Sequence, residues 1–345
     1  NNLRDFAIGE SQDQKIIGRF LEAHFPEAIE IELSDFLDIV TGPLAVRSSS
    51  LLEDSKLHPF AGIYQTFMLA NQHSDKAVRI KQLTCAIKRV YASTFLSNAK
   101  AYMKATSHRL EEEKMAVVIQ MIVGVPHGDR YYPDFSGVAR SYNFYPRPPM
   151  GACDGIVAVG LGMGEQVVSG GPAVRFCPKN PEHGLAYSNV KEVLDHSQKE
   201  FLAIKLKGEK KEADPSDLGE FGQLHHYTLN EAEQDKTLNR VASTYSHENN
   251  TLSDGISRAG TRVITFAPLL KDRDFPLSDV LEFILEMGKW GMSSAVEVEF
   301  AVNLNQDTQV PHEFKILQIR PLVQSREVEE LNIESTVTEE HLCKS

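Results

Sequence analysis

The chain has 345 residues, 41% of them hydrophobic and 24% charged, an ordinary globular composition with room for two or three domains or one large enzyme domain. Its formal net charge of −12 argues against a nucleic-acid partner, and the lack of a long apolar run or a secretion signal argues against a membrane partner. Four widely spaced cysteines, Cys85, Cys153, Cys177 and Cys343, have no paired metal spacing and indicate reduced thiols in a cytoplasmic protein.

Helical patterns flank one short strand in the first third of the chain. Residues 1 to about 42 predict helix, from an apolar stripe through Ile16 and Phe20, and residues 76–106 predict a long helix. Between them, residues 44–46 predict a strand that ends in Arg47 and three serines. Such a strand end either presents donors to a phosphate or forms a surface turn. Gly62 either lets the backbone approach a ligand or begins a turn into a strand.

The rest of the chain predicts mostly sheet. A near-continuous apolar run at residues 115–123 predicts a buried strand, and the glycine-, proline- and tyrosine-rich residues 124–185 predict sheet and loops. The polar residues 207–260 predict a surface excursion with patchy structure. Helical periodicity returns at residues 277–290, and the acidic tail after Pro321 is expected to be loosely held.

Two strand-like runs near the end of the chain carry the most informative side chains. In residues 296–302, apolar residues alternate with Glu297 and Glu299, so both carboxylates share a face, roughly 6–7 Å apart. In the second run, Gln318 and Arg320 share a face by the same rule. If the runs pair as a hairpin, these four side chains converge and suit Mg²⁺ and a phosphate, and therefore a nucleoside triphosphate. The alternative is the solvated edge of a half-buried sheet.

Other motifs give weaker signals. Gly160, Gly162 and Gly164 form G-x-G-x-G and not G-x-G-x-x-G, and no βαβ unit with an acidic residue follows, so we reject a dinucleotide fingerprint. A glycine loop near a ligand and simple sheet curvature both remain open. His108 is expected at the surface, and the pair at residues 225–226 has no companions at metal spacing. No Ser/His/Asp or Cys/His arrangement stands out.

Several segments, taken in order, resemble the motifs of one family. They are Val46-Arg47-Ser48-Ser49-Ser50 with Glu53-Asp54, Phe60-Ala61-Gly62 and Thr66-Phe67 (V-R-S-S-A-x-x-E-D…F-A-G-x-x-D/E-T-F), the helix at 86–93 (A-x-K-x-V-W-A-S), 117–123 (V-V-V-Q-x-M-V), 136–139 (S-G-V-A-F-T), 162–170 (G-L-G-E-x-V-V-S-G), and 296–300 with 317–321 (D-I-E-W…L-Q-A-R-P). Over roughly residues 44–323 the chain is therefore similar to the nucleotide-binding domain of phosphoenolpyruvate synthase and pyruvate phosphate dikinase.

The resemblance implies an α/β (α+β) ATP-grasp fold, in which two subdomains clamp ATP with Mg²⁺. It implies an N-terminal subdomain at residues 1–110 that lacks the first part of the family domain, a C-terminal subdomain at residues 111–325 that contains the excursion, and an acidic tail at residues 326–345. In that family ATP phosphorylates a histidine on a separate swivelling domain, and the phosphohistidine domain passes the phosphoryl group to pyruvate on a pyruvate/PEP barrel domain. Those two domains are the implied partners, and an oligomer is compatible with the resemblance.

The resemblance also implies roles for individual residues. Arg47 would hold phosphate, and Gly62 and Thr66 would lie in the loop over the triphosphate. Gln120 and Ile122 would border the adenine. Glu299 and Gln318 would hold Mg²⁺, with Glu297 beside them at the nucleotide. Arg320 would contact phosphate and stabilise charge during the transfer, so Arg47 and Arg320 are the expected catalytic residues.

Departures from the family motifs keep alternatives open. A G-G-K-x segment is not found before Arg47, the histidine and barrel domains are not in this chain, and the chain starts without Met, so we expect a truncated, divergent member. Lys100 stands where the family has arginine, and Arg140 stands where it has phenylalanine. One alternative keeps the clamp but changes the acceptor to a glucan or an antibiotic. The other is a degenerate domain that senses nucleotide or serves as a scaffold.

Overall fold

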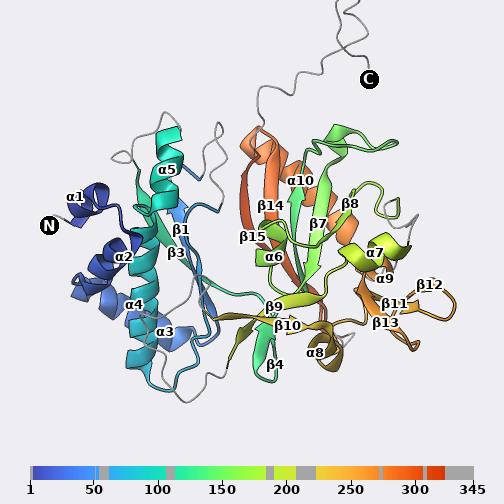
Figure 1. The fold of residues 1–345 in the computed structure, drawn as a ribbon, viewed down its shortest axis with the longest axis horizontal. Coiled ribbons are helices and arrows are strands. Elements are labelled where there is room, and N and C mark those ends of the chain that lie inside the picture. Colours follow the sequence, from blue (N-terminus) through green and yellow to red (C-terminus); the bar gives the residue numbers. More distant parts are fainter. Residues whose placement is uncertain are drawn as a thin grey trace, which may run out of the picture.

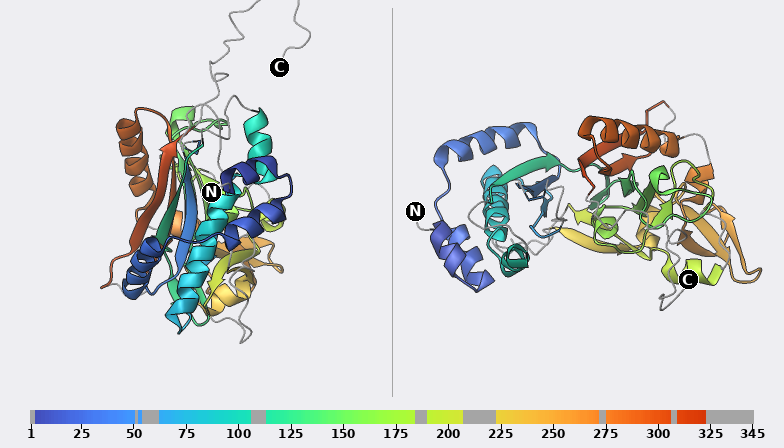
Figure 2. Two further views of the ribbon diagram at one scale, coloured as in Figure 1. Left: turned by 90° about the vertical axis from the view of Figure 1, so that its left-hand side faces the viewer. Right: turned by 90° about the horizontal axis from the view of Figure 1, so that it is seen from above.

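The computed structural model describes residues 3–50, 52–53, 62–105, 113–183, 190–206, 223–271, 275–305 and 309–322. These residues form two lobes that lie side by side (Figures 1 and 2). We call the part up to Met121 the first lobe, drawn in blue to teal, and the part from Val125 onward the second lobe, drawn in green to red. The predicted acidic tail, His108 and residues 207–222 of the predicted excursion lie outside the described residues.

Helices cover one face of the first lobe. The helical prediction for residues 1–42 is confirmed as three helices, α1 (Leu3–Gly9), α2 (Asp13–Glu22) and α3 (Glu27–Ile39). The prediction for residues 76–106 is confirmed as two, α4 (Lys76–Ser93) and α5 (Ser97–Ala105). The Asp75 side chain caps α4 by accepting a hydrogen bond from the Ala77 N–H at 2.8 Å. None of the helices in the described part of the chain has the length and apolar character needed to cross a membrane.

A three-stranded antiparallel sheet packs against α3 and α4. Its central strand β1 (Leu44–Ser50) lies between β2 (Phe67–Leu69) and β3 (Met115–Met121). Val46, Phe67 and Leu83 are fully buried between the sheet and the helices. The strand is longer than predicted because β3 pairs with it along its whole length, as far as Ser50. Arg47 therefore lies in the middle of a strand, and its predicted place at a strand end is wrong.

The prediction that β3 is a buried strand is also wrong. Val118 is 41% exposed and Met121 is 60% exposed. β3 is an edge strand, and only its Val117 and Ile119 side packs against the core under the helices. The apolar residues of β3 therefore lie on both faces of the sheet, one packed under the helices and one accessible. A continuous run of apolar residues in the sequence does not distinguish this arrangement from full burial of the strand.

The main sheet of the second lobe has five antiparallel strands. Their order is β15 (Glu313–Pro321), β14 (Val296–Asn303), β6 (Phe135–Arg140), β7 (Ile156–Leu161) and β8 (Val174–Phe176). The predicted helix at residues 277–290 is confirmed as α10 (Leu277–Met292), which packs on this sheet through Leu281 and Leu285. The short α6 (Glu165–Val168) contacts β6 and β7. Among the described strands every pairing is antiparallel, so the rejection of a parallel βαβ fingerprint is confirmed.

Two smaller sheets complete the second lobe. The prediction of sheet and loops for residues 124–185 is confirmed by β4 and β5 in one of them and by β6, β7 and β8 in the main sheet. One has the order β10 (Leu224–Thr228), β9 (Glu200–Lys205), β5 (Arg130–Tyr132) and β4 (Val125–His127). The other has the order β12 (Thr251–Asp254), β11 (Ala242–Ser246) and β13 (Thr261–Ile264). Around them lie the helices α7 (Val190–His196), α8 (Leu229–Gln234) and α9 (Ala267–Lys271) and the 3₁₀ turn η1 (Ala152–Asp154).

The prediction of a surface excursion is wrong for residues 237–245. Leu238, Val241 and Ala242 are fully buried and belong to the main core of the second lobe. Charged residues on either side of this segment, such as Lys236, Glu248 and Asp254, are exposed, so the average composition hides a short apolar segment that packs inward.

The lobes are joined at their base. The Gln223 N–H donates to the Met68 carbonyl oxygen at 2.9 Å, and the Gln223 side-chain oxygen accepts from the Ala70 N–H. Ala45 and Ile122 are buried in the same cluster as the core of the second lobe. The division between residues 110 and 111 stays a prediction; β3, which follows it, pairs with β1 of the first lobe.

Candidate functional site

A cleft of about 830 Å³ lies between the two lobes, a size within the range of small-molecule sites in proteins. It is lined by all the site residues that the sequence predicts, although they come from distant parts of the chain: Arg47, Gly62, Thr66, Gln120, Ile122, Glu297, Glu299, Gln318 and Arg320. The structure thus brings the whole predicted set together. The functional roles of these residues stay predictions.

The wall on the first lobe is the open face of its sheet. The register pairs Ala45 of β1 with Met68 on one side and with Gln120 on the other, and all three line the cleft. Arg47 lies two residues further along β1 and so projects from the same face. The end of the apolar run, residues 120–123, therefore forms part of this wall.

Gly62 lies in the turn that precedes β2, and it lines the cleft. It has φ +77°, in the left-handed region, and a Cβ built on it would meet nothing within 4 Å. A glycine at this position keeps the turn unstrained and leaves its backbone open to the cleft. Thr66 is the last residue before β2. It is half-buried and lines the cleft.

The wall on the second lobe is the predicted hairpin, which is confirmed. β14 pairs with β15 in the register Glu297 to Arg320 and Glu299 to Gln318. The register shifts after Glu299, so that Leu317 has no opposite residue and also lines the cleft. Such a bulge turns neighbouring side chains and is frequent beside functional sites. The alternation pattern predicts the pairing of the strands but not the bulge.

Glu297 is held by two arginines. Its Oε2 atom accepts from Arg140 Nε at 2.5 Å and its Oε1 atom accepts from Arg320 Nε at 2.8 Å. The side chain is only 6% exposed. Burial acts to raise the pKa of this carboxyl, but the charges of Arg320 and Arg140 outweigh it and hold the pKa below its ordinary value. Glu297 is therefore an ionised bridge between two guanidinium groups, and both of its oxygens have partners.

Arg320 is the centre of this charged group. Its Nη2 atom lies 3.6 Å from Glu299 Oε1, in addition to its bonds to Glu297. Burial acts to lower its pKa, but the carboxylates of Glu297, Glu299 and Glu53 outweigh burial and raise the pKa above its ordinary value. Arg320 therefore carries a full positive charge, held in a fixed position at the cleft wall.

The two predicted Mg²⁺ ligands already interact with guanidinium groups. Glu299 faces Arg320, and the Gln318 side-chain oxygen accepts a hydrogen bond from Arg47. Within the described ranges no group of three or more His, Cys, Asp or Glu is placed to hold a metal ion. One carboxylate with one amide oxygen nevertheless fits Mg²⁺, because this ion takes few protein ligands and completes its shell with waters and substrate phosphates.

At the other end of the cleft, the chain between the lobes is already hydrogen-bonded. The Ile122 N–H donates to the Pro43 carbonyl at 2.9 Å, and the Ile122 carbonyl accepts from the Tyr131 hydroxyl at 3.1 Å. The Ile122 N–H is therefore already used, whereas its carbonyl oxygen keeps a second lone pair and its side chain is apolar. Gln120 is half-buried and lines the cleft beside it.

Two cleft residues were not assigned a role from the sequence. Glu53 accepts from the Ser48 hydroxyl at 2.8 Å and from the Ser50 N–H at 2.9 Å, and it lines the cleft near Arg320. Its position in the serine-rich motif was a usable signal. Arg140 departs from the family motif, and that departure was the only sign of its role as a partner of Glu297.

Other residues noted in the sequence lie away from the cleft. The Lys100 ammonium donates to the Ala7 and Glu10 carbonyl oxygens at 2.5 and 2.6 Å, so it ties α5 to the end of α1. His225 and His226 are exposed on β10. By contrast, Gly164 lines the cleft in the loop between β7 and α6, which favours the interpretation of a glycine loop near a ligand.

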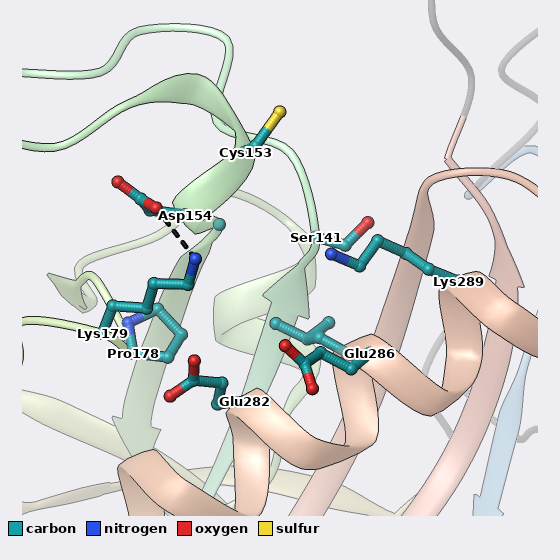
Figure 3. Close-up of a pocket in the computed structure, with 10 residues that line it drawn as sticks. Ser141, Cys153, Asp154, Pro178, Lys179, Glu282, Glu286 and Lys289 are labelled. Atoms are coloured by element: carbon teal, nitrogen blue, oxygen red, sulfur yellow. Dashed lines mark ion pairs between the residues drawn. The ribbon is translucent and has the colours of Figure 1, made fainter.

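A second hollow lies on the far side of the main sheet, between η1 and α10 (Figure 3). Its volume is about 20 Å³, room for little more than a water molecule. Lys179 spans it and pairs with Asp154 at 3.1 Å, and Glu282 and Glu286 of α10 face it (Figure 3). This hollow is a surface ion-pair cluster and does not compete with the cleft as a functional site.

Comparison with known proteins identifies the family to which this fold belongs. The chain belongs to the family of the pyruvate phosphate dikinase AMP/ATP-binding domain, whose model matches residues 2–341. The α/β ATP-grasp prediction is thereby confirmed, and the cleft is that of an ATP- or AMP-binding domain. The chain is also similar to the uncharacterized phosphotransferase YvkC of Bacillus subtilis (strain 168), with 25% identity over 166 residues. That match covers 47% of this chain and 18% of the relative, so the chain spans a small part of the relative's length.

Proposed function

We propose that this chain is the Mg-ATP-binding domain of a phosphoenolpyruvate-synthase-like phosphotransferase. Its own step is to bind ATP with Mg²⁺ and to donate a phosphoryl group to a histidine on a separate swivelling domain. The final acceptor is pyruvate on a barrel domain of the full-length protein. The membership in an ATP-binding phosphotransferase family is the starting point of this proposal.

One observation carries the proposal. Arg47 of the first lobe and Gln318 of the second are in direct contact, and Gln318 lies opposite Glu299 and two residues from Arg320. A phosphate-binding guanidinium, a second guanidinium and two oxygen ligands for a hard cation therefore meet at one place in the cleft. Transfer of a phosphoryl group needs positioning and neutralisation of charge more than covalent chemistry by the protein, and this set of side chains supplies both.

The residues have distinct parts in the transfer. The acceptor imidazole nitrogen forms a P–N bond while the P–O bond to the leaving group breaks, and negative charge develops on the leaving oxygen. Arg47 and Arg320, which both line the cleft, would neutralise that charge. Glu299 and Gln318 would hold Mg²⁺, which when bound neutralises and orients the phosphates. Gln120 and Ile122, which line the cleft, would border the adenine.

Isothermal titration of the chain with ATP in the presence of Mg²⁺ tests this function. We expect saturable binding that Glu299→Ala weakens strongly, because one of two protein ligands of the ion is lost. Glu22→Ala is the matched control, since Glu22 is an exposed carboxylate on α2 outside the cleft. Equal binding heats for the wild type and Glu299→Ala, or no binding by the wild type, would refute the proposal.

A second experiment separates the acceptors. The full-length protein is incubated with ATP labelled at the transferred phosphate and analysed for phosphohistidine, with pyruvate, glucan or a candidate antibiotic then added. Loss of label to pyruvate is expected. Loss only to a glucan or an antibiotic would favour a dikinase with another acceptor, and binding of ATP without phosphohistidine would favour a degenerate sensing or scaffold domain. The Lys100 departure no longer supports the degenerate alternative, because Lys100 lies outside the cleft.

A further inference from the structure

Arg140 has donor groups that none of the described residues uses. It is the last residue of β6, and the register of β6 against β14 places it opposite Glu297. Only its Nε atom bonds Glu297, at 2.5 Å. The two terminal nitrogens donate to no acceptor among the residues that the structure describes, and the side chain is 48% exposed and lines the cleft.

The hydrogen-bond geometry at this wall suits an anion. Glu297 lies between the guanidinium groups of Arg140 and Arg320, and Glu299 lies 3.6 Å from Arg320 Nη2, so the charges of the two arginines and the two glutamates balance. Among the described residues Arg140 pairs with Glu297 alone, which leaves its terminal N–H groups available to an anion. Glu297 fixes the Nε edge of both arginines. A guanidinium that is held by one edge presents its terminal N–H groups in a fixed direction, and such a fork matches the oxygens of a phosphate.

We propose that Arg140 is a phosphate-binding residue of the cleft, whose terminal nitrogens bind an oxygen of the nucleotide phosphates while its Nε stays on Glu297. This inference rests on the proposed function and adds a contact that the family motif does not supply, since the motif S-G-V-A-F-T resembled by residues 136–139 has phenylalanine at this place. Arg140 thus gives this chain a third guanidinium at the phosphates, beside Arg47 and Arg320.

The test measures binding of ATP and AMP to the wild type, Arg140→Gln and Arg140→Lys. We expect Arg140→Gln to weaken ATP binding about tenfold, the size of one charge-assisted hydrogen bond, and to weaken AMP binding less. Arg140→Lys keeps the charge and is expected to recover part of the loss. Arg175→Gln is the matched control, because Arg175 is an exposed arginine on β8 of the same sheet and does not line the cleft.

A double-mutant cycle separates phosphate binding from a merely structural role. If Arg140 acted only by holding Glu297, Arg140→Gln would have no effect in a Glu297→Gln background, and this result would overturn the inference. We expect the loss of ATP affinity to persist in that background. Where Glu297→Gln does not fold, the comparison of ATP with AMP in Arg140→Gln alone decides, and an equal loss for both nucleotides counts against the inference.

The outcomes also separate this inference from the proposed function. If the wild type binds no ATP, the proposed function fails and the inference fails with it. If the wild type binds ATP and Arg140→Gln binds it within twofold of the wild type, the inference alone is wrong.

Discussion

Arg47 of β1 and Gln318 of β15 join the two lobes across the cleft through a hydrogen bond from the guanidinium to the amide oxygen. The first is the proposed phosphate ligand and the second is a proposed ligand of Mg²⁺. In this structure the Arg47 guanidinium, which would bind a phosphate, is bonded to the Gln318 amide oxygen, which would bind Mg²⁺. We therefore expect binding of ATP with Mg²⁺ to break this bond, because Arg47 would then bind a phosphate and Gln318 would hold the ion.

Arg47→Ala removes the phosphate contact and the bond between the lobes. We expect ATP affinity to fall at least tenfold, because a charge-assisted hydrogen bond to phosphate is lost. The free energy of unfolding should change by only about 1 kcal/mol, the usual net value of one hydrogen bond. Titration calorimetry and chemical denaturation measure the two effects, with the exposed Arg19→Ala as control. Unchanged ATP affinity in Arg47→Ala would remove Arg47 from the site.

Removal of Mg²⁺ gives a second prediction. Addition of a chelator should weaken ATP binding by the wild type, since Glu299 and Gln318 then face the phosphates without the ion between them. In Glu299→Ala the chelator should change ATP affinity much less, because the ion is already poorly held. Calorimetric titrations at several Mg²⁺ concentrations measure this difference. An equal chelator effect in both proteins would show that the ion binds elsewhere.

The ion-paired Glu297 gives the protein a defined sensitivity to acid. Its pKa is below the ordinary value of 4.5 in the folded state, so the folded state binds fewer protons than the unfolded state. Its contribution to stability is therefore present above pH 4.5 and is lost as the pH falls through the lower folded value. We expect Glu297→Gln to unfold in less denaturant than the wild type at pH 7, with a difference that narrows toward pH 3. Glu22→Gln, at an exposed site, is the control.

Glu297→Ala should have a larger effect at pH 7. Removing this side chain leaves the largely buried Arg320 guanidinium without its main partner, and breaking a buried pair in this way costs about 3–5 kcal/mol. Thermal and chemical denaturation measure the loss. If Glu297→Ala is as stable as the wild type, the bridge between Arg140 and Arg320 contributes nothing to the fold.

Local patterns in the sequence are sufficient to predict the β14–β15 hairpin, but they do not predict every contact of the candidate site. The alternation around Glu297 and the shared face of Gln318 and Arg320 depend only on the two-residue period of a strand, and both are found in the structure. The contact of Arg140 with Glu297 joins residues 157 positions apart, and no short-range pattern encodes it. The exposure of β3 depends on whether a second layer covers that face of the sheet. Tertiary packing decides this, and a run of apolar residues does not.

Asp134 gives the opposite pH dependence to Glu297 and provides an independent check. Burial raises the pKa of its carboxyl to about 6, although the Leu304 N–H donates to it at 2.7 Å and favours the charged form. The folded state therefore binds more protons than the unfolded state between the ordinary value of 3.8 and about 6. This group's contribution to stability falls as the pH rises through that window, by an amount on the order of 3 kcal/mol.

Asp134→Asn should abolish that loss, because asparagine still accepts from the Leu304 N–H and carries no charge to bury. We expect the variant to be more stable than the wild type at pH 7 and close to it at pH 4, as measured by chemical denaturation at both pH values. Asp195→Asn, at an exposed site on α7, is the matched control. ATP affinity should be unchanged, since Asp134 is not among the residues that line the cleft. A variant less stable than the wild type at pH 7 would mean that Asp134 is ionised and stabilising in the folded protein.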